Sequence, residues 1–398
     1  MKNFVYISPQ FPDYFYKFVE ALKNNGFRIL GIGDDPYENL SPRLKAALTE
    51  YYVCYNMDSF DNEVRAVQYF QDKYGHIDYL ESNNEYWLGK DAKLREIFNI
   101  TTGPMGNQID LYNHKSLMKQ GYEKAGLKTA RWLIVSDEKQ LFDFIEEVGY
   151  PVFIKPDHGV GAEETFKIKK KEDVYAFFAK KQDNISYICE QFITGNIVSF
   201  DGICDSNSNV VFCASNFFPP SIADVVHEKK DVFYYTFPKV PEQLEKMGRK
   251  VIKAFEVKQR FFHLEFFKLT KATKGVGKVG DFVPLETNMR PAGGYTPDLI
   301  NFANSSDVYK IYADVMAFDE NRQKDEFKHH YAACASRRDE FSYLHSDEEV
   351  LEKYKNAMCS HGRYAPIFSG AMGNRYFMAI FDSLKALEEF RKFAEARK

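Results

Sequence analysis

Apolar residues in the first hundred positions alternate between short continuous runs and helical spacings. Residues 4–8 and 28–33 are apolar runs typical of buried strands, and segment 13–24 between them has the spacing of an amphipathic helix. The alternation continues through residues 41–81. It predicts a small parallel α/β sheet in the N-terminal part of the chain.

The pattern changes after a helical stretch at 112–124. Two pairs of segments have the form of antiparallel hairpins, 197–204 with 209–215 and 260–267 with 282–288. Residues 217–241 have no clear period and are expected to form a loop. The tail predicts a further compact unit, with strands at 330–336, 363–368 and 375–381 and helices at 347–358 and 383–395.

Composition and charge narrow the function classes. The chain is 44% hydrophobic and 28% charged, which is ordinary for a globular protein. A net charge of -4 gives no electrostatic reason to expect a nucleic acid or an anionic membrane as partner. No stretch reaches the roughly 18 apolar residues of a membrane span, and the first apolar run is too short for a signal sequence. The six cysteines form no CxxC pair, so we expect a cytoplasmic protein with reduced thiols.

Acidic residues on the second predicted hairpin form the strongest candidate site. Glu286 and Asn288 have i, i+2 spacing and therefore share one face of a strand. Glu265 on the neighbouring strand can lie across from them, at about 5 Å. Carboxylate and amide oxygens are the ligands that Mg²⁺ prefers, and two close carboxylates would repel unless a cation lay between them. Glu265 alone would be an ordinary exposed strand residue.

A basic residue and two glycines follow the acidic strand. Arg290 continues the spacing of Glu286 and Asn288, and its forked donors can hold a phosphoryl group or a developing oxyanion. Gly293 and Gly294 leave backbone N–H groups accessible to an anion.

Two segments nearer the N-terminus suit a nucleotide. Lys155 ends an apolar strand and is followed by a loop with Gly159 and Gly161, which can present an ammonium and free amides to phosphate oxygens. The chain contains no GxxxxGK[ST] motif. In the segment 187–195 a strand ends in Glu190. Backbone groups at 191–193 can form hydrogen bonds with an adenine ring, and the apolar side chains of this segment would cover the ring.

In this order, the segments resemble the ATP-grasp superfamily, nearest to its carboxylate–amine ligase and carbamoyl-phosphate-synthase or biotin-carboxylase-like branches. The resemblance covers about 110–305, and residues 1–110 are similar to the preATP-grasp domain of such enzymes, including ESNNE at 81–85. Its matching segments are Asn113-His114-Lys115, IKPDHGVGA (154–162), CEQFITG (189–195), FHLEFF (262–267) and LETNMRPAGG (285–294).

The resemblance implies a multidomain α/β and α+β protein with an ATP-grasp fold. The implied units are a Rossmann-like preATP-grasp domain over 1–110, an ATP-grasp domain over 111–325 and a C-terminal α/β subdomain over 326–398. Within 111–325 it implies a small lid subdomain at about 130–195 and a metal-bearing sheet at about 196–305.

The resemblance also assigns roles to residues and names the cofactors, ATP and Mg²⁺, with Mn²⁺ as an alternative metal. The implied phosphate-binding residues are Lys115, Lys155, Gly159, Gly161 and Ala162; the adenine hinge is Glu190, Gln191, Phe192 and Ile193; the metal ligands are Glu265, Glu286 and Asn288; and the residues at the reacting group are Arg290, Gly293 and Gly294. Relatives often place an acidic residue for the ribose where this chain has Asn196 and Ile197, which leaves Asp201 as a candidate.

The activity that the resemblance implies is an ADP-forming ligase reaction. Such an enzyme activates a small carboxylic acid, here an amino acid or peptide, as an acyl phosphate and transfers it to an amine. The expected partners are these small molecules, and a homodimer is common among relatives. Two alternatives stay open: a biotin-carboxylase-like enzyme that phosphorylates bicarbonate, and a non-catalytic protein that senses ATP.

Overall fold

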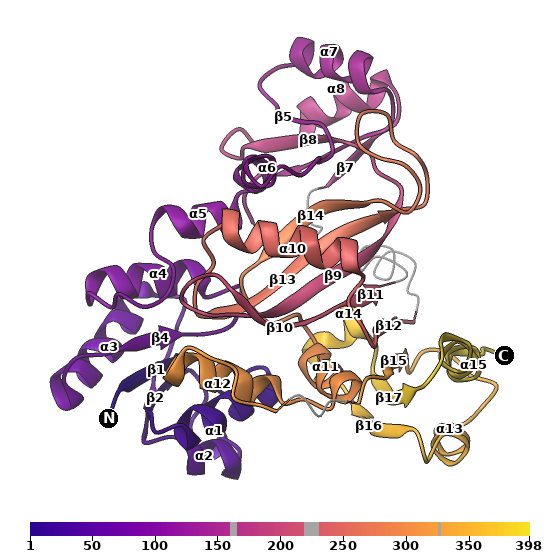
Figure 1. Cartoon of the computed structure of the whole chain (residues 1–398). Coiled ribbons are helices and arrows are strands. Elements are labelled where there is room, and N and C mark those ends of the chain that lie inside the picture. Colours follow the sequence, from indigo (N-terminus) through magenta and orange to yellow (C-terminus); the bar gives the residue numbers. More distant parts are fainter. Residues whose placement is uncertain (160–164, 219–230, 325–327) are drawn as a thin grey trace.

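The N-terminal part of the computed structural model is a parallel sheet with helices on both faces (Figure 1). Its strand order is β3-β2-β1-β4, and all three pairings are parallel, as the sequence predicts. Successive residues of β1 pack into two different cores, Phe4 and Tyr6 into one and Val5 and Ile7 into the other. The elements are β1 (Asn3–Ile7), α1 (Tyr16–Asn24), β2 (Arg28–Gly33), α2 (Pro42–Ala47), β3 (Glu50–Val53), α3 (Phe60–Tyr74), β4 (Tyr79–Glu81) and α4 (Leu88–Ile97).

A second, small sheet has the antiparallel order β5-β8-β6-β7 and lies at the top of Figure 1. Helices α7 and α8 pack on it through a core that includes Leu141, Phe177 and Ile154. Two helices, α5 (Asn107–Asn113) and α6 (Lys115–Lys124), connect it to the N-terminal sheet. Its elements are β5 (Trp132–Ile134), α7 (Glu138–Val148), β6 (Val152–Pro156), β7 (Phe166–Ile168), α8 (Lys171–Lys180) and β8 (Tyr187–Gln191).

The third sheet has nine strands and includes both predicted hairpins, β9 with β10 and β13 with β14. Helix α10 (Glu242–Ala254) covers one face, where its Leu244 and Val251 pack with Phe262. Helix α12 (Val308–Phe318) covers part of the other face. The strands are β9 (Gly195–Cys204), β10 (Val210–Ala214), β11 (Asn216–Phe218), β12 (Phe233–Thr236), β13 (Arg260–Leu269), β14 (Phe282–Asn288), β15 (Tyr331–Arg337), β16 (Met358–Arg363) and β17 (Arg375–Phe381).

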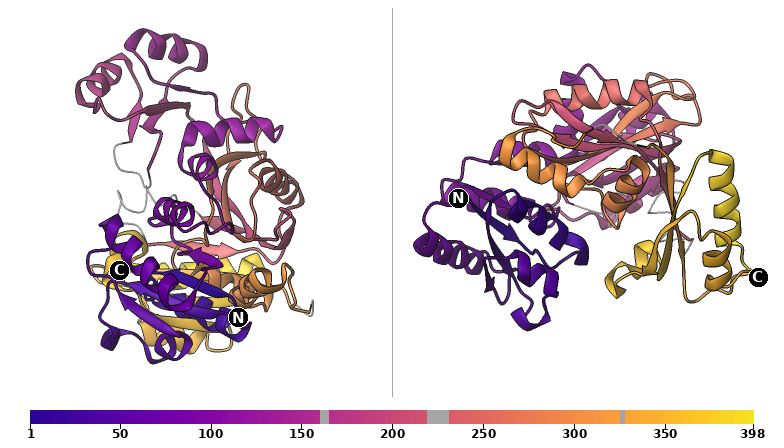
Figure 2. Two further views of the ribbon diagram at one scale, coloured as in Figure 1. Left: turned by 90° about the vertical axis from the view of Figure 1, so that its left-hand side faces the viewer. Right: turned by 60° about the horizontal axis from the view of Figure 1, so that its bottom comes forward.

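The C-terminal strands extend this central sheet, because β15 pairs with β12 along four residues. The right-hand view of Figure 2 shows them and the N-terminal sheet on opposite sides below the central sheet. The remaining helices are α11 (Thr296–Asn304), α13 (Asp347–Lys353), α14 (Ser369–Met372) and α15 (Leu384–Glu395). Among the helices of the described residues, none is both long and apolar enough to cross a bilayer.

Two local predictions are wrong. Residues 233–236 were expected in a loop but form the buried strand β12. Apolar and polar residues do not alternate along this strand, because both of its faces are covered. A strand was expected at 363–368, but the strand found in this region is β16, at 358–363. Its position is determined by pairing with β17 and not by a run of apolar residues. The structure describes residues 1–159, 165–218, 231–324 and 328–398.

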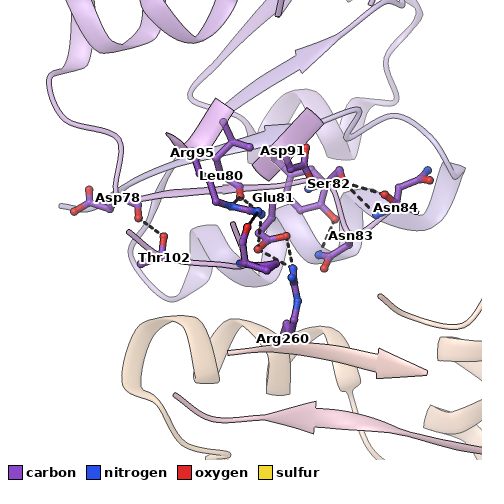
Figure 3. Close-up of polar contacts among 12 residues, drawn as sticks. Asp78, Leu80, Glu81, Ser82, Asn83, Asn84, Asp91, Arg95, Thr102 and Arg260 are labelled. Carbon is purple, nitrogen blue, oxygen red and sulfur yellow. Dashed lines mark hydrogen bonds and ion pairs between the residues drawn. The ribbon is translucent and has the colours of Figure 1, made fainter. Parts of the chain in front are cut away.

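A buried ion network joins the N-terminal sheet to the central sheet (Figure 3). The carboxylate of Glu81, at the end of β4, contacts Arg95 at 2.8 Å and Arg260, at the start of β13, at 2.8 and 2.9 Å. The exposed fractions of these three side chains are 5% or less, so two guanidinium groups share one carboxylate away from water. The network fixes the loop that follows β4 next to the central sheet.

Candidate active site

The acidic residues of the predicted hairpin lie on one face of the central sheet. In the ladder Glu265 is opposite Glu286, and His263 is opposite Asn288. The opposite face carries Leu264, which packs in the core under α10. The structure therefore brings Glu265, Glu286 and Asn288 together at the end of β14.

The two carboxylates have opposite pKa shifts. Burial raises the pKa of Glu286, and the neighbouring charge of Glu265 raises it further. Burial also acts to raise the pKa of Glu265, but the hydrogen bond and charge of His263, together with the charges of Arg290 and Lys155, outweigh it, and the pKa is lowered. Ionisation of Glu286 is therefore unfavourable while Glu265 is charged, and a cation between the two carboxylates would favour it.

His263 lies between two carboxylates. Its Nδ1 is 2.5 Å from Asp201 Oδ1 and its Nε2 is 3.1 Å from Glu265 Oε1. Burial disfavours the imidazolium, but Asp201 and Glu265 overcome this and raise the pKa of His263 to about 10. Asp201, a candidate for the ribose, is therefore engaged by His263, and also by Ser199 and Asn216.

Arg290 contacts Glu85, in the loop after β4, through Nε at 2.9 Å and through Nη2. Burial opposes the charge of Arg290, but Glu85, Glu286 and Glu265 raise its pKa. The contact with Glu85 was not predictable from the sequence, because 205 residues separate the two side chains.

The two glycines after Arg290 lie at the junction with the C-terminal strands. The Gly293 carbonyl accepts a hydrogen bond from the Thr296 hydroxyl at 2.7 Å. Gly294 has a φ of +61°, and a Cβ at this position would be 2.8 Å from Met372 Cε. A residue with a Cβ at 294 would therefore have a strained backbone conformation and would require Met372 Cε to move.

A buried cluster of two lysines and one glutamate lies between the small sheet and helix α6. Lys155 Nζ is 3.0 Å from Glu190 Oε1, and Lys119 Nζ is 3.1 Å from Glu190 Oε2. Burial acts against ionised Glu190, but the two lysines lower its pKa to about 2. Burial also disfavours the ammonium of Lys155, yet Glu190 and Glu286 raise its pKa.

Lys119 is a site residue that the sequence analysis missed. It lies one helical turn after Lys115 on α6, and this i, i+4 spacing places both lysines on one face. That spacing was the available signal, but it is also common on solvated helices.

Lys115 reaches the loop after β6. Its Nζ donates to the Gly159 carbonyl at 2.9 Å, and burial lowers its pKa. Asp157 anchors the start of α6 to the same loop, since its carboxylate accepts from Ser116 N and Ser116 Oγ. Gly161 and Ala162 lie outside the described residues.

The proposed adenine hinge follows directly from β8. The backbone N–H of Gln191 donates to the Arg131 carbonyl, and its side chain donates to the Lys274 carbonyl. Ile193 packs with Leu269 in a small apolar core, and the ring of Phe192 lies 4.1 Å from Lys167 Nζ. Because the Gln191 N–H is engaged, a base would use other backbone groups at 191–193.

The fold is shared with solved enzymes. The chain matches the crystal structure of an L-amino acid ligase from Bacillus licheniformis with a TM-score of 0.72 at 15% identity, over 98% of this chain and 96% of that one. The chain has the ATP-grasp fold. The fold class predicted from the sequence is thereby confirmed.

Relatives in sequence match shorter stretches of this chain. It is 31% identical to D-alanine–D-alanine ligase B of Clostridium perfringens over 119 residues, which are 28% of this chain and 39% of the ligase. It is 25% identical to an L-arginine-specific L-amino acid ligase of Bacillus subtilis over 215 residues, 52% of each protein. The chain thus spans about half or less of these relatives. No family model matches it.

Proposed function

We propose that this chain is an ATP-dependent, ADP-forming ligase that joins a small carboxylic acid to an amine. The observation that carries the proposal is the convergence of opposite charges from the small sheet and helix α6 on one side and the central sheet on the other. Lys155 of the small sheet lies within electrostatic reach of Glu265 and Glu286 of the central sheet, and Lys115 within reach of Glu286. A triphosphate with its metal would satisfy both sets of charges at once.

The donor set suits ATP and Mg²⁺. Two facing carboxylates and the Asn288 amide are hard oxygen ligands. The pKa of Glu286 is raised by burial and then by the charge of Glu265, and a divalent cation between the carboxylates would relieve the second effect. Among the described residues no three His, Cys, Asp or Glu side chains form a metal cluster of their own, so phosphate oxygens would complete the coordination. When bound, the metal would neutralise charge on the terminal phosphates.

The chain's own residues supply the other steps. Lys155 and Lys115 would hold the phosphates, and the backbone after β8 would hold the base. Arg290 would orient the substrate carboxylate and stabilise the charge that develops as one of its oxygens attacks the terminal phosphorus. The amides of Gly293 and Gly294 would assist at the same end. The acyl phosphate formed would then be attacked by the amine, and phosphate would leave.

The substrates we propose are amino acids or short peptides. The support comes from the relatives, whose names specify D-alanine and L-amino acids. Glu85 places a carboxylate beside the guanidinium of Arg290. This combination suits a substrate that carries both an ammonium and a carboxylate group.

The test is a screen of amino-acid pairs for ADP release, with Glu286→Gln and Glu389→Gln compared on the best pair. Glu389 is exposed on α15, so its variant controls for the loss of one carboxylate. We expect turnover to fall by roughly 100-fold or more in Glu286→Gln and to stay unchanged in the control. Equal turnover in both variants would refute the proposal. Turnover stimulated by biotin and bicarbonate would favour the carboxylase alternative, and tight ATP binding without ADP release would favour a sensor.

A further inference from the structure

Glu265 is held by a chain of hydrogen bonds that crosses the central sheet. Its Oε1 is bound by His263 Nε2, and the opposite ring nitrogen is bound to Asp201. Asp201 in turn accepts a hydrogen bond from Asn216 Nδ2 at 2.7 Å, and Asn216 Oδ1 accepts one from Thr236 Oγ1 at 2.5 Å. The chain therefore links β13, β9, β11 and β12.

The residues behind Glu265 are buried, and this makes the arrangement rigid. His263 is 5% exposed, Asp201 3%, and Asn216 and Thr236 0%. Both nitrogens of the imidazole face oxygens that can only accept, so the ring has no alternative partner towards which it could rotate. The ring of Phe218 lies edge-on to it, at 6.3 Å between centroids.

This arrangement has a consequence for the second oxygen of Glu265. Oε1 is bound to His263, no hydrogen bond to Oε2 is found among the described residues, and Glu286 is the ladder partner of Glu265, so Oε2 is the oxygen that a cation shared with Glu286 would use. Without that bond, the repulsion between the two carboxylates would favour other rotamers of Glu265, and binding a cation would require ordering the side chain again.

We propose that His263 is a positioning residue that presents Glu265 to the divalent cation and thereby sets the affinity of the metal site. The inference rests on the proposed function, in which Glu265 is a metal ligand. It assigns His263 no contact with substrate or metal, and it makes Asp201 the residue that fixes the imidazole. Bonds from outer residues of this kind typically affect metal affinity by about 10- to 100-fold.

Two amide substitutions separate positioning from a merely structural role. In His263→Gln the side-chain amide lies near the place of Nε2 and can still donate to Glu265. In His263→Asn it lies near the place of Nδ1, so it can donate to Asp201 but does not reach Glu265. Both variants lose the ring and its packing on Phe218, so they serve as controls for each other.

The measurement is the dissociation constant of Mn²⁺ in the presence of ADP, by electron paramagnetic resonance of the free ion, for the full chain. We expect His263→Asn to weaken Mn²⁺ binding by at least about tenfold and His263→Gln to weaken it by less than about threefold. The thermal unfolding midpoints of the two variants should be similar. Equal weakening in both variants, or no weakening in His263→Asn, would overturn the inference.

A third variant distinguishes this inference from the proposed function. Glu265→Gln removes the presented carboxylate and should weaken Mn²⁺ binding at least as much as His263→Asn. If Glu265→Gln binds Mn²⁺ as the wild type does, the metal site of the proposed function is wrong. If Glu265→Gln loses the metal while His263→Asn retains it, the proposed function stands and only the role of His263 is refuted.

Discussion

Removal of the Glu190 charge should destabilise the small sheet strongly. In Glu190→Gln the ammonium groups of Lys119 and Lys155 would remain near each other without the carboxylate that each now contacts at 3.1 and 3.0 Å. Lys119 is 1% exposed and Glu190 7%, so water cannot replace the lost partner. Breaking a buried ion pair by removing one member typically costs about 3–5 kcal/mol.

The pKa of Glu190 gives a second value for the same interaction. The two lysines overcome the effect of burial and lower this pKa from 4.5 to about 2. A difference of about 2.5 pKa units corresponds to roughly 3 kcal/mol of folding free energy at neutral pH. Because the folded-state pKa is lowered, this contribution is present above about pH 4.5 and is lost as the pH falls towards 2. Glu190→Gln should lack this pH dependence.

Lys119→Met is the matched variant. It leaves one lysine paired with Glu190 and removes the repulsion between the two ammonium groups, so it should cost less than half as much as Glu190→Gln. Trp132 on β5 pairs with Glu190 in the ladder and reports on this sheet. In a Trp87→Phe background, urea unfolding followed by Trp132 fluorescence measures each free energy. Equal losses in the two variants, or a loss below about 1 kcal/mol in Glu190→Gln, would refute the reasoning.

Three further predictions concern other contacts. Tyr122→Phe removes the buried hydrogen bond of 2.6 Å to Thr287 Oγ1 and should lower the free energy of unfolding, measured in urea, by about 1–3 kcal/mol. The double variant Tyr122→Phe with Thr287→Val should lose less than the sum of the two single variants. Glu81→Gln leaves two buried arginines without their carboxylate and should lower the free energy of unfolding by about 3 kcal/mol or more. The control Glu20→Gln, which breaks an exposed pair with Arg43, should lower it by less than about 1 kcal/mol, and similar losses in both variants would contradict the account of the network. Gly294→Ala should lower the thermal unfolding midpoint, because φ is +61° and Met372 Cε is close. The second substitution Met372→Ala should restore part of this loss. If it restores nothing, the backbone conformation alone is responsible.

Much of the central sheet was predictable because it is built from local signals. The i, i+2 spacing placed Glu286 and Asn288 on one face of their strand, and the antiparallel hairpin then made Glu265 a neighbour. The parallel N-terminal sheet followed from regular alternation of strands and helices. These features depend on residues that are close in sequence or on a side-chain period.

Features that depend on distant residues were not predictable. The contact of Glu85 with Arg290 joins different sheets, and a single sequence carries no signal of it. Strand β12 has no alternation because it is covered on both faces by segments remote in sequence. Lys119 was missed because the local sequence does not show whether a lysine on a helix is buried or exposed. Its burial makes it part of the site.

The most direct test of the proposed function follows the oxygen atoms of the carboxylate. The best substrate pair from the ADP-release screen is supplied with both carboxylate oxygens labelled with ¹⁸O, and the products are analysed by mass spectrometry. In-line attack on the terminal phosphorus, with Arg290 and the lysines in the proposed roles, predicts ADP, one label in inorganic phosphate and the other in the ligated product. AMP and pyrophosphate, with the label in AMP, would contradict the account, because the carboxylate would then have attacked the α-phosphorus.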